Sequence, residues 1–179
     1  METWVDSETV YEGKLVTLRR GSVRLDGGQE ATREVVEHNG GVTIAPWTGE
    51  AVVLIRQYRI ATAKEMLELP AGKLEAADED PLERGRLELE EETGYVAGRM
   101  IAAGHFFPSC GFLTEKLHLF LALDLEKTEQ RLEWDEVIEV VEMPVAEVQR
   151  RLNAHEFDDA KTIIGLHALL NHPEVAGGE

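Results

Sequence analysis

The chain has 179 residues, of which 43% are apolar and 30% charged, a balance typical of one globular domain. Its formal net charge of −17 argues against nucleic acid or an anionic membrane as a partner, because both require a basic surface. The single cysteine excludes an intrachain disulfide, and no apolar stretch approaches the ~20 residues of a membrane helix. The N-terminal segment lacks the basic and apolar regions of a signal peptide, so we expect a cytoplasmic protein.

The N-terminal segment predicts β-structure. Residues 9–20 and 22–37 alternate between apolar and polar side chains with a period of about two. Asp26-Gly27-Gly28 lies between short runs of β-forming residues, which predicts a hairpin turn.

A second pair of strands is expected next. Residues 42–47 and 51–58 are rich in apolar and β-branched side chains. Thr48-Gly49-Glu50 separates them, so we expect a second hairpin here.

One helix is predicted in the middle of the chain, over residues 81–93. Pro81 suits a first helical turn, and Gly94 suits the position just past a helix end. Further strands are expected at 99–106, 116–125 and 137–143. Two final helices are expected, one starting near Pro144 and one over about Asp159 to Asn171. Strands, a helix, more strands and then helices make an α+β pattern rather than a regular βαβ alternation.

The predicted central helix carries three glutamates on one face. A helix advances by about 100° per residue, so Glu88, Glu91 and Glu92 fall within an arc of about 100°. Like charges this close repel each other. Mg²⁺ or Mn²⁺, which prefer oxygen ligands, would explain why these carboxylates lie together.

The segment around this helix resembles the Nudix box. That family's pattern is Gly, five residues, Glu, seven residues, then Arg-Glu-apolar-any-Glu-Glu-any-Gly-apolar. Residues 88–95, which read ELEEETGY, fit every required position, Glu79 takes the place of the upstream Glu, and Gly72 that of the opening Gly. Further segments, at 33–38, 56–59 and 109–116, resemble the ADP-ribose pyrophosphatase branch.

Three departures from the family's pattern stand out. One extra residue lies between Gly72 and Glu79, Leu87 replaces the arginine of the box, and Cys110 replaces a proline usual in this branch. On a helical wheel Arg84 falls between Glu91 and Glu88, whereas Arg86 points nearly opposite. We therefore hypothesise that Arg84 partly takes over the role of the missing arginine, which in the family orients the catalytic carboxylates.

The resemblance implies a fold and an assembly. It implies a Nudix-type α/β/α sandwich with a mixed β-sheet, the box helix on one side and the C-terminal helices on the other. Residues 38–179 would form the catalytic domain, with the box at 72–95. Residues 1–37 would form an N-terminal β-region in the interface of a homodimer, which would also cover its apolar side chains.

Pyrophosphate hydrolysis needs an activated water and neutralised phosphate charge, and divalent cations supply both. Glu88 and Glu92, four residues apart, can hold metal ions from one helix face. Glu91 can ligate too, or hold a metal-bound water. The resemblance adds the backbone carbonyl of Ala71 as a ligand.

The remaining site residues lie outside the box. The resemblance places a loop glutamate opposite the box helix, here Glu115, as the general base, with Glu91 as the alternative. Arg59 and Arg33 are the best candidates for phosphate or ribose contacts, because a guanidinium grips phosphate with two hydrogen bonds. Glu68 is a weaker candidate for binding substrate or metal.

The resemblance implies a Mg²⁺- or Mn²⁺-dependent hydrolase of nucleoside diphosphate-linked compounds. ADP-ribose, giving AMP and ribose 5-phosphate, is the leading substrate. One alternative keeps the chemistry and changes the substrate to another nucleotide sugar or a dinucleotide, such as a GDP-sugar, FAD or NADH. Another is a catalytically silent Nudix module that senses such a ligand, and a third is an acidic domain that buffers metal ions.

Overall fold

The structure is a computed structural model that describes residues 1–76 and 78–177. The expected ranges 72–95 and 38–179 include residues 77, 178 and 179, which lie outside the described residues. The strands are β1 Glu2–Glu12, β2 Thr17–Leu25, β3 Glu30–Glu37, β4 Gly41–Pro46, β5 Ala51–Arg59, β6 Lys64–Glu68, β7 Ala71–Lys73, β8 Tyr95–Phe106, β9 Leu117–Lys127 and β10 Glu139–Pro144. The helices are α1 Pro81–Thr93, α2 Val145–Asn153, α3 Ala160–Leu170 and α4 Pro173–Ala176.

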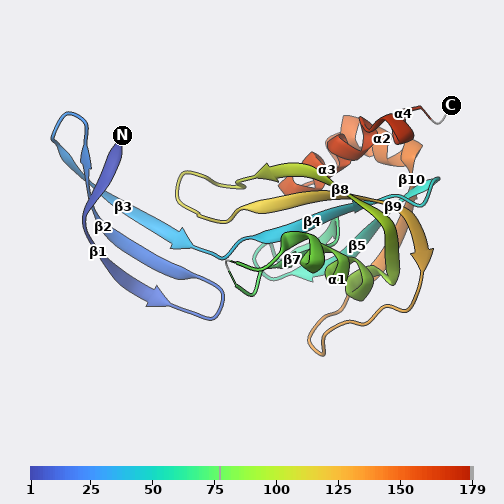
Figure 1. Ribbon diagram of the computed structural model, residues 1–179, viewed down its shortest axis with the longest axis horizontal. Helices are drawn as coiled ribbons and strands as arrows, with labels where there is room; N and C mark the ends of the chain where they lie inside the picture. The colour runs from blue at the N-terminus through green and yellow to red at the C-terminus, as the bar shows by residue number, and fades with distance from the viewer. Residues whose placement is uncertain (77, 178–179) are drawn as a thin grey trace.

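The first three strands form an antiparallel sheet of their own, in the order β1-β2-β3. Figure 1 shows this N-terminal sheet projecting away from the rest of the chain. The hairpin predicted at Asp26-Gly27-Gly28 joins β2 to β3 and is confirmed. The stretch 9–20 is not one strand, because Gly13 donates to the carbonyl of Val16 at 2.9 Å and turns the chain between β1 and β2.

The second predicted hairpin is wrong. β4 joins a mixed sheet of order β7-β4-β9-β8, in which β4 and β9 are parallel, whereas β5 joins an antiparallel sheet of order β10-β5-β6. Among the described residues, Trp47 and Val52 form the one bridge between the two segments. β4 and the first half of β5 are buried on both faces, and a continuous apolar run does not specify which neighbour a strand pairs with.

Side chains alternate across the mixed sheet and build two apolar layers. On β4, Val42 and Ile44 belong to the cluster that includes Leu89 of α1. Ala45 belongs to the opposite cluster, which includes Leu166 of α3. Figure 1 shows α1 on one side of the strands and α2, α3 and α4 on the other, so the α/β/α prediction is confirmed.

The central helix occupies the predicted range. Asp80 caps it by accepting a hydrogen bond from the amide of Leu82 at 2.9 Å, and Pro81 opens the first turn. Gly94 ends the helix in the left-handed region, with φ of 67°, where glycine has no Cβ to clash. These local signals set where the helix begins and ends.

The later strands and helices are close to their predicted positions, and three short elements were not predicted. These elements are β6, β7 and α4, which are too short for a periodic pattern to reveal. No helix formed by residues 1–76 or 78–177 has the length and apolar character needed to cross a membrane.

Candidate active site

A cavity of about 270 Å³ lies beside α1 and β7. We call it the carboxylate cavity, because its acidic lining residues are Glu75, Glu88, Glu91, Glu92, Glu133 and Glu136. Three cations also line it, Arg59, Lys73 and Arg84. The structure thus brings the three predicted box glutamates together at one cavity. It also places Glu133 and Glu136 there, which were not predicted.

Two of the helix carboxylates are largely removed from water. Glu92 is 4% exposed, and its Oε2 accepts a hydrogen bond from the amide of Ala71 at 2.9 Å. Burial raises the pKa of Glu92 to about 8 and that of Glu88 to about 7. The hydrogen bond from the Ala71 amide lowers the pKa of Glu92, and the charge of Arg84 lowers that of Glu88, but burial outweighs both effects.

Gly72 lets the chain before the helix approach Glu88. A Cβ added at Gly72 would lie 1.9 Å from Oε1 of Glu88, well inside contact distance. Any side chain at position 72 would therefore displace this carboxylate from the cavity.

Arg84 lies where the hypothesis for the missing arginine requires it. Its Nε donates to Oε1 of Glu79 at 2.7 Å, and its Nη1 lies 3.7 Å from Oε1 of Glu88. Leu87, which replaces the arginine of the box, is 48% exposed. Arg86 is not among the lining residues of the carboxylate cavity and donates instead to the carbonyl of Ala97 at 3.3 Å.

The donor chemistry of the cavity fits a hard divalent cation. Glu88, Glu91 and Glu92 supply carboxylate oxygens, and the two with raised pKa would be stabilised as anions by a bound cation. Within residues 1–76 and 78–177, no three His, Cys, Asp or Glu side chains are already arranged around one point as metal ligands. The residues are therefore chemically suited to the metal.

Glu115, the predicted general base, lines an adjoining cavity of about 290 Å³. Its Oε1 lies 3.7 Å from Nδ1 of His38. The two cavities share Arg59 and the three residues of β7, so Glu115 lies near the box glutamates but lines a separate cavity.

The loop between β9 and β10 brings two further carboxylates to the carboxylate cavity, those of Glu133 and Glu136. This loop is fastened to the C-terminal end of α1. The side chain of Gln130 donates to the carbonyl of Glu92 at 2.7 Å, and the amide of Arg131 donates to the carbonyl of Glu91 at 2.9 Å. The acidic composition of this loop was the signal available in the sequence.

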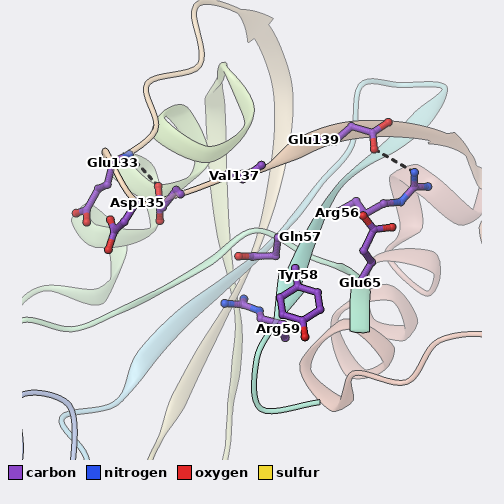
Figure 2. A pocket seen from close by; sticks show the side chains of 10 residues that line it. Arg56, Gln57, Tyr58, Arg59, Glu65, Glu133, Asp135, Val137 and Glu139 are labelled. Carbon is purple, nitrogen blue, oxygen red and sulfur yellow. Dashed lines mark hydrogen bonds and ion pairs between the residues drawn. The ribbon is translucent and has the colours of Figure 1, made fainter. Parts of the chain in front are cut away.

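A third cavity, of about 670 Å³, extends the site (Figure 2). It shares Gln57, Arg59, Glu133 and Glu136 with the carboxylate cavity. Tyr58, 57% exposed, also lines it. There is therefore room beside the carboxylates for a group larger than a phosphate.

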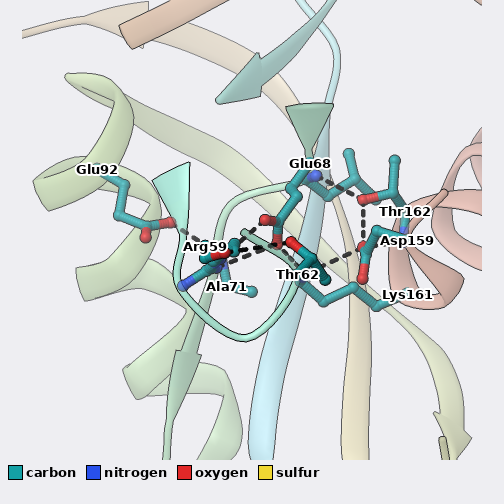
Figure 3. Close-up of polar contacts among 9 residues, drawn as sticks. Arg59, Thr62, Glu68, Ala71, Glu92, Asp159, Lys161 and Thr162 are labelled. Carbon is teal, nitrogen blue, oxygen red and sulfur yellow. Dashed lines mark hydrogen bonds and ion pairs between the residues drawn. The ribbon is translucent and has the colours of Figure 1, made fainter. Parts of the chain in front are cut away.

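Arg59 lines all three cavities and is held by Glu68. Its Nε and Nη2 donate to the two carboxylate oxygens of Glu68 at 2.8 and 3.0 Å (Figure 3). Glu68 itself is 2% exposed, and it lines none of these cavities. The predicted substrate residues Arg59 and Glu68 thus lie together, with the arginine toward the cavities.

Arg33 lies apart from the other predicted site residues. It sits on β3 in the N-terminal sheet, where its Nε donates to Glu2 at 2.9 Å. Figure 1 shows that this sheet lies away from α1. Within one chain, Arg33 is not brought to the carboxylate cavity.

Comparison with known proteins identifies the family. The NUDIX domain family matches residues 37–164. A protein from Bacillus subtilis (strain 168) named ADP-ribose pyrophosphatase is 34% identical over 171 residues, which cover 94% of this chain and 92% of that protein. A methanol dehydrogenase activator from Bacillus methanolicus is 36% identical with the same coverage. The crystal structure of an ADP compounds hydrolase matches with a TM-score of 0.86 over 99% of this chain and 97% of that chain, at 22% identity.

The chain therefore belongs to the Nudix family, as the box predicted. It is a Nudix hydrolase similar to ADP-ribose pyrophosphatases.

Proposed function

We propose that this protein hydrolyses the pyrophosphate bond of ADP-ribose to give AMP and ribose 5-phosphate. The observation that carries the proposal is the carboxylate cavity, where three box glutamates and the cations Arg59 and Arg84 line one space. The similarity to a protein named ADP-ribose pyrophosphatase over nearly the whole chain supports this choice of substrate.

Glu88 and Glu92 would hold Mg²⁺ or Mn²⁺, together with the carbonyl of Ala71. Such an ion, when bound, lowers the pKa of its water and neutralises phosphate oxygens. Glu91 would ligate as well or orient the attacking water. Arg84 would keep Glu88 aimed into the cavity through its contacts with Glu79 and Glu88.

Two residues are candidates for the general base, Glu115 and Glu136. The family resemblance favours Glu115, and this assignment stays a prediction. Glu136 is a second candidate, because its carboxylate comes from a loop and lines the same cavity as Glu88 and Glu92. A base must lie within hydrogen-bond reach of the water that it deprotonates, directly or through one water.

Arg59 would bind a phosphate oxygen of the substrate. It lies where the three cavities meet, and the fork of its guanidinium suits phosphate. The 670 Å³ cavity beside it would accept the part of the substrate beyond the pyrophosphate.

A homodimer and a cytoplasmic location also remain proposals. β1 exposes apolar side chains along its length, including Trp4, Val10 and Tyr11 at 42%, 48% and 58%. A second copy that covers this strand would bury them. In such a dimer Arg33 could reach the partner's cavity, which it does not do within one chain.

Relative rates on several substrates test the proposal. We expect ADP-ribose to give the highest kcat/KM, when compared with GDP-mannose, FAD, NADH and a nucleoside triphosphate at saturating Mg²⁺. A higher value for one of the others would keep the chemistry and replace the substrate. Tight binding of ADP-ribose without turnover in Mg²⁺ or Mn²⁺ would favour the ligand-sensing alternative.

A further inference from the structure

A buried carboxylate joins the C-terminal helices to the cavities. Glu68, the last residue of β6, is 2% exposed and accepts both of the Arg59 hydrogen bonds described above. Lys161, in the first turn of α3, forms an ion pair with the same carboxylate. Figure 3 shows the two cations reaching Glu68 from different parts of the fold.

The first turn of α3 is itself fixed at this place. Asp159 caps it, since its Oδ2 accepts from the amide of Thr162 at 2.9 Å and from the hydroxyl of Thr162 at 2.6 Å. The hydroxyl of Thr162 also accepts from the amide of Leu69 at 2.9 Å. Lys161, 13% exposed and 3.0 Å from Asp159, therefore has little freedom to leave Glu68.

Glu68 needs both cations. Burial alone would raise its pKa, but the hydrogen bonds from Arg59 and the charge of Lys161 hold that pKa below its ordinary value. Removing one partner of a buried ionic group leaves a charge that is poorly compensated. Without Lys161, Glu68 and Arg59 would be expected to shift toward water.

The position of Arg59 matters because one edge of its guanidinium is committed to Glu68. Nε and one N–H of Nη2 donate to that carboxylate, which leaves the second N–H of Nη2 and both of Nη1 for a ligand oxygen. The arginine side chain is 41% exposed and long, so it keeps one conformation only where its partners hold it.

We propose that Lys161 is a positioning residue for Arg59 that acts through Glu68, so that the C-terminal helix α3 sets the geometry of phosphate binding. The inference rests on the proposed function, in which Arg59 binds a phosphate oxygen. It also makes Glu68 a bridge between two cations rather than a group that touches substrate.

Three variants test the role of the Lys161 charge. Lys161→Met removes the charge at similar length, and Lys161→Arg keeps it. Lys64→Met is the matched control, because Lys64 lies 2.6 Å from Asp158 and also ties β6 to the segment before α3, but without Glu68. We expect Lys161→Met to raise KM for ADP-ribose about tenfold with kcat changed less than about threefold, Lys161→Arg to recover most of the loss, and Lys64→Met to change neither.

The same substitution in an Arg59→Ala background separates positioning from direct contact. If Lys161 acts through Arg59, Lys161→Met should raise KM by less than about twofold in that background. A further tenfold increase would overturn the inference, because it would mean that Lys161 binds substrate independently. Equal losses in Lys161→Met and Lys64→Met would also overturn it, since they would report only the docking of α3.

The motion of the Arg59 side chain gives a readout that needs no turnover. ¹⁵N relaxation at Nε of Arg59, assigned with Arg59→Lys, should show an order parameter that falls by about 0.2 in Lys161→Met and is unchanged in Lys64→Met. An unchanged value in Lys161→Met refutes the inference whatever the substrate is. If the expected fall is found in a protein that cleaves none of the substrates, only the proposed function fails.

Discussion

The guanidinium of Arg84 lies between two carboxylates, 2.7 Å from Glu79 and 3.7 Å from Glu88. Glu79 is held in turn, because its Oε2 accepts a hydrogen bond from the amide of Glu75 at 2.7 Å. Arg84 is 18% exposed, so its interactions are only partly screened by water. The positive charge that Leu87 does not supply therefore reaches Glu88 from one helical turn earlier.

Replacing this arginine should impair catalysis far more than replacing its neighbour. We expect Arg84→Ala to lower kcat/KM by about 10²-fold, because Glu88 loses the cation that orients it. Arg86→Ala, the matched control on the same helix, should stay within about twofold. Steady-state kinetics with ADP-ribose make the comparison, and equal, small effects of both substitutions would contradict the role given to Arg84.

Two glutamine variants distinguish Glu136 from Glu115 as the general base, and a third serves as their control. Because Glu136 lines the cavity of the box glutamates, we expect Glu136→Gln to lower kcat by about 10²-fold or more with little change in KM. Glu115→Gln should have a smaller effect, and Glu133→Gln controls for loss of a charge from the same loop. A large loss of kcat in Glu115→Gln alone would assign the base to Glu115, as the family resemblance implies.

The buried helix carboxylates should make the metal-free protein sensitive to alkaline pH. The pKa values of Glu88 and Glu92 are about 7 and about 8, above the ordinary 4.5 in both cases, so the folded state binds more protons than the unfolded state between about pH 5 and pH 8. The free energy of unfolding therefore falls as pH rises through that window. Thermal unfolding in EDTA should show a lower Tm at about pH 8 than at about pH 6.

Two comparisons link this pH dependence to the cavity. Glu92→Gln should show a smaller loss of Tm across the same window, because the neutral amide has no proton to release. Saturating Mg²⁺ should raise the Tm of the native protein more at about pH 8 than at about pH 6, since the ion competes with protons for the carboxylates. If the Tm of the native protein changes with neither pH nor Mg²⁺, the cavity is not a metal site.

The exposed apolar side chains of β1 should hold two copies of the chain together. Light scattering at micromolar concentration should give the mass of a dimer for the native protein. Val10→Glu combined with Tyr11→Glu should shift that mass toward the monomer, because charges would enter the covered surface. A monomeric native protein would refute the dimer.

Local signals explain which parts of the fold could be predicted from the sequence. Asp80, Pro81 and Gly94 mark the ends of α1 by backbone chemistry alone, and that helix lies where it was predicted. The partners of β4 and β5 were mispredicted, because β4 and the first half of β5 are continuous buried apolar runs, which do not indicate the neighbouring strand.

The site shows the same difference between local signals, which the sequence carries, and tertiary contacts, which it does not. The three box glutamates share one helix, so their common face follows from helical periodicity. Glu136 arrives from a loop that Gln130 and Arg131 fasten to the end of α1, a tertiary contact that no sequence period records. The link from Lys161 through Glu68 to Arg59 is likewise a tertiary contact, because Lys161 lies far from the other two residues in the sequence.

Product analysis of ADP-ribose incubated with Mg²⁺, using the native protein beside Glu92→Gln, tests whether the carboxylate cavity is the catalytic site. We expect chromatography to show AMP and ribose 5-phosphate in equal amounts from the native protein, none in EDTA, and little from the variant. Cleavage that survives in Glu92→Gln at the native rate, or that needs no divalent ion, would contradict the assignment of the carboxylate cavity as the catalytic site.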